Sequence, residues 1–134
     1  MNFKELKNRC EHITLLYVEN DNEIRELKYS IFRDIFKSVL VAKDAQDALK
    51  IYQCNQIDLI ITELFMLNMS GFDMVKKIKA IEPDVKVIAY SSFSETEYLS
   101  KFNLSEFDAY IRKPIEKEKL FSTIYDVISR ERVN

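Results

Sequence analysis

The chain has 134 residues, of which 47% are hydrophobic, and a formal net charge of -2. This size and apolar content are enough for one domain with a hydrophobic core that needs no disulfide or metal support. The nearly balanced charge excludes an overall electrostatic attraction to nucleic acid or acidic membranes. No apolar run approaches the roughly 20 residues that span a bilayer, and the first residues do not read as a secretion signal. We therefore expect a cytoplasmic protein whose cysteines, Cys10 and Cys54, remain thiols.

Residues 1–12 are expected to form a tail or a short helix, with Phe3 and Leu6 as docking points. Residues 13–131 are expected to form the folded domain. Within it, five short runs are rich in branched and aromatic residues and carry little charge, as strands covered on both faces require. These runs are residues 13–18, 39–41, 57–62, 85–91 and 109–111.

Between and after these runs, apolar residues recur at helical spacing. The stripes are Ile24, Leu27, Ile31 and Ile35; Ala45, Ala48, Leu49 and Tyr52; Phe72, Val75 and Ile78; Tyr98, Leu99 and Phe102; and Leu120, Ile124, Val127 and Ile128. Four helix starts are marked by capping side chains: Asn20 with Glu23, Asp44, Ser70 with Asp73, and Ser94 with Glu97. Alternating strands and helices predict an α/β fold, a doubly wound parallel sheet with helices on both faces.

In such a sheet, reactive groups gather at the carboxyl ends of the strands. Glu19 and Asn20 follow the first predicted strand, Glu63 follows the third, Ser91 ends the fourth, and Lys113 with Pro114 follows the fifth. Two carboxylates, a hydroxyl and an ammonium group are therefore expected to meet at one edge. The only histidine, His12, is read as an ordinary surface residue.

Four stretches at these strand ends carry a resemblance to a known family. They are Tyr17-Val18-Glu19-Asn20, residues 62–71 (Thr-Glu-Leu-Phe-Met-Leu-Asn-Met-Ser-Gly), Tyr90-Ser91-Ser92, and Tyr110-Ile111-Arg112-Lys113-Pro114-Ile115. In this order the chain resembles the receiver domains of two-component response regulators over about residues 13 to 130. The resemblance implies a flavodoxin-like (βα)5 fold with strand order 2-1-3-4-5.

The sequence departs from the family at the residues that perform its chemistry. In the family, an Asp after the third strand accepts phosphate, and an acidic pair after the first strand helps that Asp to hold Mg²⁺. Glu63 stands at the acceptor position, and Asn20 replaces the second acidic residue. A carboxylate one methylene longer misplaces the attacking oxygen by about 1 Å. Glu19, Asn20 and Glu63 are thus weakened candidates for Mg²⁺ ligands, and no cofactor is expected.

Other parts of the family's switch are retained. Ser91 is the hydroxyl that would follow a phosphate, Lys113 would neutralise one, and Tyr110 is the ring that the family couples to that hydroxyl. Without phosphate, Lys113 can pair directly with Glu63.

A partner face is expected around the helix after the fourth strand and the last helix. Its aromatic residues are Phe93, Tyr98, Phe102, Phe121 and Tyr125. Two copies of the chain, or another signalling protein such as a histidine kinase or an output protein, would meet there.

The sequence favours a receiver-like interaction module that is not an enzyme, takes no phosphate and binds neither nucleic acid nor membrane. Alternatives are a receiver that still binds Mg²⁺ and accepts phosphate, a receiver segment of a longer regulator, and a flavodoxin-like small-molecule binder. Three carboxylates in residues 19–23 oppose the last reading, because a phosphate cradle needs glycines and free amides.

Overall fold

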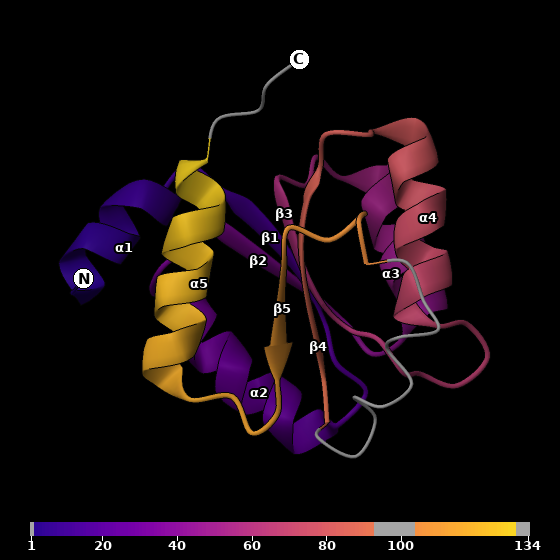
Figure 1. Ribbon diagram of the computed structural model, residues 1–134, viewed down its shortest axis with the longest axis horizontal. Coiled ribbons are helices and arrows are strands. Elements are labelled where there is room, and N and C mark those ends of the chain that lie inside the picture. The colour runs from indigo at the N-terminus through magenta and orange to yellow at the C-terminus, as the bar shows by residue number, and fades with distance from the viewer. Residues whose placement is uncertain (1, 93–103, 131–134) are drawn as a thin grey trace.

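A computed structural model describes residues 2–92 and 104–130 of the chain. Its elements in chain order are α1 (Phe3–Cys10), β1 (Thr14–Val18), α2 (Asn22–Phe32), β2 (Ser38–Ala42), α3 (Ala45–Cys54), β3 (Leu59–Glu63), α4 (Gly71–Ile81), β4 (Lys86–Ser91), β5 (Ala109–Arg112) and α5 (Lys117–Ser129). The five strands form one parallel sheet in the order β2-β1-β3-β4-β5, so the predicted architecture is confirmed (Figure 1). The helix predicted after the fourth strand rests on Tyr98, Leu99 and Phe102, which lie outside the described residues.

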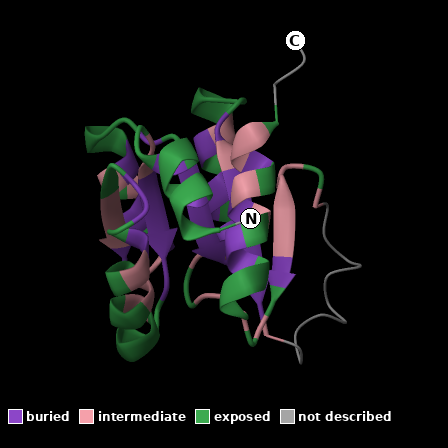
Figure 2. Cartoon of the chain, turned by 90° about the vertical axis from the view of Figure 1, so that its left-hand side faces the viewer, coloured by how far each residue is buried: buried purple, intermediate pink, exposed green. Residues whose placement is uncertain are grey.

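The sheet separates two hydrophobic cores. Successive side chains of a strand point to opposite faces, so Leu15 and Tyr17 of β1 enter one core while Leu16 and Val18 enter the other. The first core is completed by α1, α2 and α5, and the second by α3 and α4. The strands are covered on both sides, and the exposed residues gather on the outer faces of the helices (Figure 2). No helix in the described ranges is long and apolar enough to cross a membrane.

Local sequence explains where the helices begin. Asp44 and Ser70 accept amide hydrogens of Asp47 and Asp73 at the starts of α3 and α4, as predicted. The predicted cap at Asn20 is wrong. The amide of Glu19 still donates to the carbonyl of Ala42, which prolongs the β1–β2 ladder, and Asp21 caps α2 by accepting from Ile24. Asn20 is exposed instead.

The stripe predicted for α2 is also partly wrong. Ile24 and Leu27 are 36% and 67% exposed, respectively. The half-buried Arg25 and Lys28 and the buried Phe32 share the covered side of this helix. Ile24 and Leu27 line a cavity that opens between α2 and the segment after β5, which leaves them in contact with solvent. The guanidinium of Arg25 donates to the carbonyl of Glu19 (2.8 Å).

The segment before the first strand contains a short helix, α1. Asn2 caps α1, and Leu6 and Cys10 are fully buried against α5, whereas Phe3 remains 45% exposed. The rings of Phe3 and Phe121 lie 6.4 Å apart. Phe121 is only 9% exposed, so the prediction that it extends an exposed aromatic patch is wrong, because α1 covers it.

Candidate functional site

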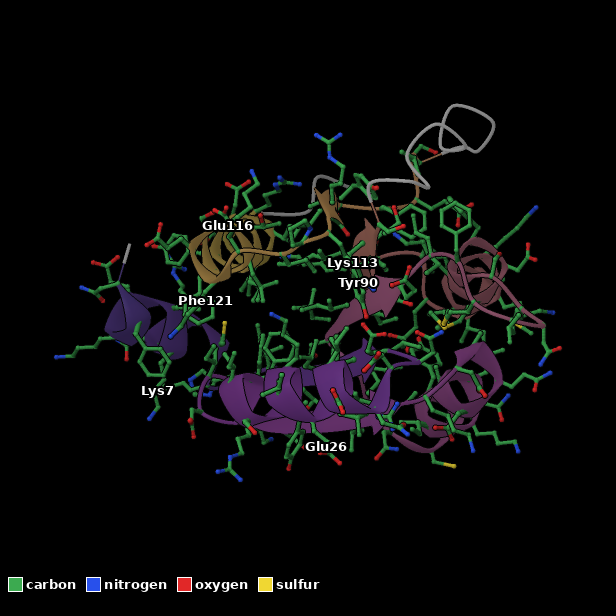
Figure 3. The ribbon with its side chains drawn as sticks, turned by 90° about the horizontal axis from the view of Figure 1, so that it is seen from below. Lys7, Glu26, Tyr90, Lys113, Glu116 and Phe121 are labelled. Atoms are coloured by element: carbon green, nitrogen blue, oxygen red, sulfur yellow. The ribbon has the colours of Figure 1, made fainter. Side chains whose placement is uncertain are left out.

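Strand alternation gathers the site residues on one side of the sheet edge. Glu19 lies two residues beyond Tyr17, Glu63 two beyond Ile61, and Tyr90 two beyond Ile88, and in each case the earlier residue points into the core beneath α2 and α5. Lys113 likewise follows Ile111, and its amide prolongs the ladder by donating to the carbonyl of Ser91 (2.7 Å). The four side chains therefore converge in the space between α2 and α5, where Lys113 and Tyr90 are seen together (Figure 3).

A buried ion pair forms the centre of this site. Lys113 Nζ lies 2.6 Å from Glu63 Oε2 and 3.7 Å from Glu19 Oε1. Glu63 is 3% exposed and Glu19 is fully buried, whereas the Lys113 side chain keeps 27% of its surface. Buried carboxylates require compensation by a cation or hydrogen-bond donors, and one ammonium group serves both here.

Glu19 has further partners that hold its carboxylate in place. Its Oε2 accepts from the amide of Asp21 (3.0 Å), and its Oε1 is 3.0 Å from the hydroxyl of Tyr90. That hydroxyl also donates to the carbonyl of Val18 (2.6 Å). Burial, assisted by neighbouring Tyr17 and Glu19, raises the pKa of Tyr90 well above its ordinary value, so the phenol stays a hydrogen donor.

Ser91 and Tyr110 pair on the other face of the sheet. Their hydroxyls form a hydrogen bond across β4 and β5, which keeps the ring of Tyr110 half-buried. The peptide bond between Lys113 and Pro114 is cis. The structure thus places the predicted hydroxyl and ring in contact. Among the contacts of the described residues, Ser91 reaches the ion pair only through its backbone carbonyl, which accepts from the amide of Lys113.

The loop from β3 to α4 holds the backbone of Glu63. Gly71 donates its amide to the carbonyl of Leu64 (2.7 Å), and a Cβ atom at Gly71 would lie 2.4 Å from the carbonyl oxygen of Glu63. Only glycine permits this approach. Asn68 adopts a positive φ of 71°, a conformation that asparagine tolerates better than most residues.

A cavity of about 490 Å³ opens beside the ion pair. Its walls are mostly apolar, and Glu19, Lys28 and Lys113 lie at its polar positions. Burial lowers the pKa of Lys28, an effect that the nearby carboxylate of Glu19 opposes. The lining residues come from β1, α2, β4 and the segment after β5: Tyr17, Glu19, Ile24, Leu27, Lys28, Tyr90, Ser92, Lys113, Pro114 and Ile115.

The side chains at this edge do not fit Mg²⁺ in their present arrangement. Mg²⁺ requires near-octahedral oxygen ligands at roughly 2.0–2.1 Å. The oxygens of Glu19 already accept from Tyr90 and Asp21, Glu63 is paired with Lys113, and Asn20 is exposed. Within residues 2–92 and 104–130, no group of three His, Cys, Asp or Glu side chains is placed to hold a metal ion.

The structure therefore brings together Glu19, Glu63 and Lys113, and separately Ser91 and Tyr110. Of the predicted partner face, Tyr125 is half-buried beneath the guanidinium of Arg9, 5.7 Å from its ring centroid. Phe93, Tyr98 and Phe102 lie outside the described residues.

Tyr90 and Arg25 both contact Glu19, although the sequence alone predicts no role for either residue. Strand alternation, which places the side chain of Glu63, also predicts that Tyr90 lies on the same side of the sheet, because the two residues are neighbours in the β3–β4 register.

Comparison with known proteins agrees with this fold. Residues 15–125 match the family described as "Response regulator receiver domain". The heme response regulator HssR of Staphylococcus saprophyticus is 32% identical over 90% of this chain, which spans 54% of that relative's length. A receiver domain from Clostridium thermocellum superimposes with a TM-score of 0.75 at 27% identity, covering 87% of this chain and 94% of that one. The non-phosphorylated HemR receiver domain from Leptospira biflexa gives the same TM-score and identity over 91% and 98%. The chain belongs to the response regulator receiver domain family.

Proposed function

We propose that this receiver domain takes no phosphate and acts in two-component signalling through contacts with other proteins. The observation that carries the proposal is the 2.6 Å ion pair between Lys113 and Glu63 on a buried strand end. The acceptor carboxylate is already neutralised by the lysine that would otherwise stabilise a bound phosphate. An incoming phosphodonor would have to break this pair without the help of a strongly held divalent cation.

The length of the Glu63 side chain supports the same conclusion. Its carboxylate extends one methylene beyond that of aspartate and reaches the ammonium of Lys113 directly. An error of about 1 Å in the position of an attacking atom can lower a rate by roughly a hundredfold.

The pair of hydroxyls supports a fixed state. Ser91 is bonded to Tyr110 while Lys113 is bonded to Glu63, so the retained parts of the switch have partners within the domain. We infer that the output of the domain is set by its own residues and by the proteins it binds, rather than by phosphate.

The surface of β5 and α5 is the proposed contact region for a histidine kinase, an output protein or a second copy of the chain. A hollow of about 450 Å³ lies there, lined by polar and aromatic side chains. Its lining residues are Ala109, Tyr110, Lys119, Ser122, Thr123, Tyr125, Asp126 and Arg130. It includes Tyr110, whose ring is tied to Ser91, so binding at this surface is physically connected to the strand ends.

Amide NMR with added Mg²⁺ and beryllofluoride, a stable phosphate mimic, tests the proposal. We expect the signals of Glu19, Glu63, Ser91 and Lys113 to keep their positions in the wild-type domain. The matched variant carries Asn20→Asp and Glu63→Asp, which restore the acidic residues of the family, and its signals are expected to move. Movement in the wild-type domain that extends to Tyr110 would show a working phosphate switch and refute the proposal.

A further inference from the structure

Tyr90 contacts both an anion, Glu19, and the cation, Lys113, of the buried site. Its hydroxyl oxygen lies 2.6 Å from the carbonyl oxygen of Val18 and 3.0 Å from Oε1 of Glu19, and both of these oxygens can accept its hydrogen. The face of its ring lies beneath Lys113, with Nζ 5.1 Å from the ring centroid. One side chain therefore binds an anion with its edge and a cation with its face.

The ring itself is held firmly. Tyr90 is 1% exposed, and its ring centroid lies 6.2 Å from that of Tyr17, which packs edge-on against Phe32 at 5.1 Å. The Tyr90 carbonyl accepts from the amide of Leu64 (3.1 Å), which ties this part of β4 to the loop after Glu63. The ring, and with it the hydroxyl oxygen, cannot move away from Glu19 without disturbing this stack.

We propose that Tyr90 is a positioning residue that excludes a divalent cation, because it holds Glu19 and Lys113 so that the ammonium group occupies the place between the two carboxylates. This inference rests on the proposed function. It adds a reason for the exclusion of Mg²⁺ that does not depend on the altered residues Asn20 and Glu63. Glu19 Oε1 is shared between the phenol and Lys113, and Oε2 accepts from Asp21, so both oxygens are already engaged. A metal ion would have to displace the phenol, the ammonium or both.

The charges around the site also favour the ammonium group of Lys113 over a metal ion between the two carboxylates. Arg25 donates to the backbone of Glu19 and the half-buried Lys28 lies close enough to interact with its carboxylate, so two further cations adjoin the pair formed by Lys113. These cationic side chains lower the negative potential that Glu19 and Glu63 present to Mg²⁺.

The test compares metal affinity with and without the hydroxyl of Tyr90. The background is the Asn20→Asp/Glu63→Asp variant, in which the acidic ligands are restored, and the test variant adds Tyr90→Phe, which keeps the ring. Mg²⁺ is titrated and followed by amide shifts, and Mn²⁺ is used as a second probe because it broadens signals near its site. We expect Tyr90→Phe to tighten binding by about tenfold, because the phenol competes with the metal ion for Oε1 of Glu19. A partner that only oriented Glu19 as a metal ligand would give the opposite result, a loss of about 10- to 100-fold.

Tyr52→Phe in the same background is the matched control. The hydroxyl of Tyr52 donates to the carboxylate of Glu82, a tyrosine–glutamate pair between α3 and the end of α4. This control removes the same kind of bond away from the strand ends, and metal affinity is expected to stay unchanged. Tyr90→Leu, which removes ring and hydroxyl together, replaces Tyr90→Phe if the latter does not give a folded spectrum.

Equal metal affinity with and without the Tyr90 hydroxyl would overturn the inference. The absence of saturable binding in both proteins would overturn it too. A tenfold gain that appears equally with Tyr52→Phe would overturn it as well, since the effect would then come from loosening of the fold. The proposed function fails separately, if the wild-type domain responds to the phosphate mimic. In that case the ratio of affinities between the two Tyr90 forms still decides the role of Tyr90.

Discussion

At the scale of single residues, the site is a balance between burial and charge. Glu63 has only 4% of its side-chain surface exposed, while Lys113 keeps 27% and reaches the pair from the rim. Removing a charge from water costs several kcal/mol, and an ion pair recovers that cost only with good geometry. The loss of one partner is therefore more harmful than the loss of both, because a lone buried carboxylate retains the full penalty.

A double-mutant cycle on the pair measures this balance. We expect Lys113→Met to lower the free energy of unfolding by about 3 kcal/mol, because it leaves Glu63 without its cation. Glu63→Gln is expected to cost less, since Lys113 can turn toward water. The double variant should be more stable than the sum of the single effects predicts. Urea unfolding of the four proteins provides the values, and strict additivity would show that the two groups do not interact.

At the scale of elements, α1 is a structural part of the domain. Leu6 and Cys10 are fully buried in the core that α5 and the sheet share, and Arg9 lies over the ring of Tyr125. The helix therefore covers a side of α5 that would otherwise expose Phe121 to water. Residues of α5 also line the hollow beside β5. The packing of α1 against α5 therefore helps to hold the proposed contact surface in place.

Truncation of Leu6 tests how strongly α1 is bound. We expect Leu6→Ala to lower the free energy of unfolding by about 3 kcal/mol, the usual cost of a large-to-small change in a packed core. Lys4→Ala on the exposed side of the same helix is the control and should change it by less than about 0.5 kcal/mol. Reaction of the buried Cys10 thiol with a thiol reagent should become faster in Leu6→Ala only. Similar reactivity in both variants would show that α1 is not held by Leu6.

The strand positions could be predicted because each depends on a short apolar run between charged segments. All five predicted runs overlap an observed strand, and Asp44 and Ser70 cap the helices that they were expected to cap. The partners of Phe121 could not be predicted, because the helix that covers it lies more than a hundred residues earlier in the chain. The exposure of Leu27 depends in the same way on a distant segment, because Leu27 lines the cavity between α2 and the residues after β5.

The candidate site was predictable in place but not in detail. Parallel strands fix where Glu19, Glu63 and Lys113 end up, and the structure places them within one network. The contribution of Tyr90 depends on the direction of a single hydroxyl among several acceptors. A pattern of residue types carries no information on that choice.

At the scale of the whole molecule, Glu19 and Glu63 lie on the same side of the sheet as most of the buried cysteine and tyrosine side chains whose pKa is raised. Tyr17, Tyr90 and Cys10 all belong to the core beneath α1, α2 and α5, whereas the core beneath α3 and α4 contains one such group, Tyr52, whose pKa burial also raises. Alkaline conditions should therefore act on both halves, and more strongly on the half that also contains the site.

Stability should fall with rising pH above about 9 for this reason. Burial raises the pKa of the Cys10 thiol from its ordinary value of 9.0 to about 12, and it also raises the pKa of Tyr17 and Tyr90 above their ordinary value of 10.0. Below pH 9.0 these groups are protonated in both the folded and the unfolded chain and leave stability unchanged. Above it the unfolded chain loses protons that the folded chain keeps, so unfolding becomes more favourable until the folded groups ionise too.

Urea unfolding over a series of alkaline pH values measures this effect. Each proton retained only by the folded chain contributes a slope of up to about 1.4 kcal/mol per pH unit. Between the ordinary pKa values of 9.0 and 10.0 the thiol of Cys10 should dominate, so Cys10→Ala is expected to flatten the slope there while the tyrosines keep it steep at higher pH. An unchanged slope in Cys10→Ala would mean that the Cys10 thiol ionises in the folded domain, and that α1 does not shield it from water.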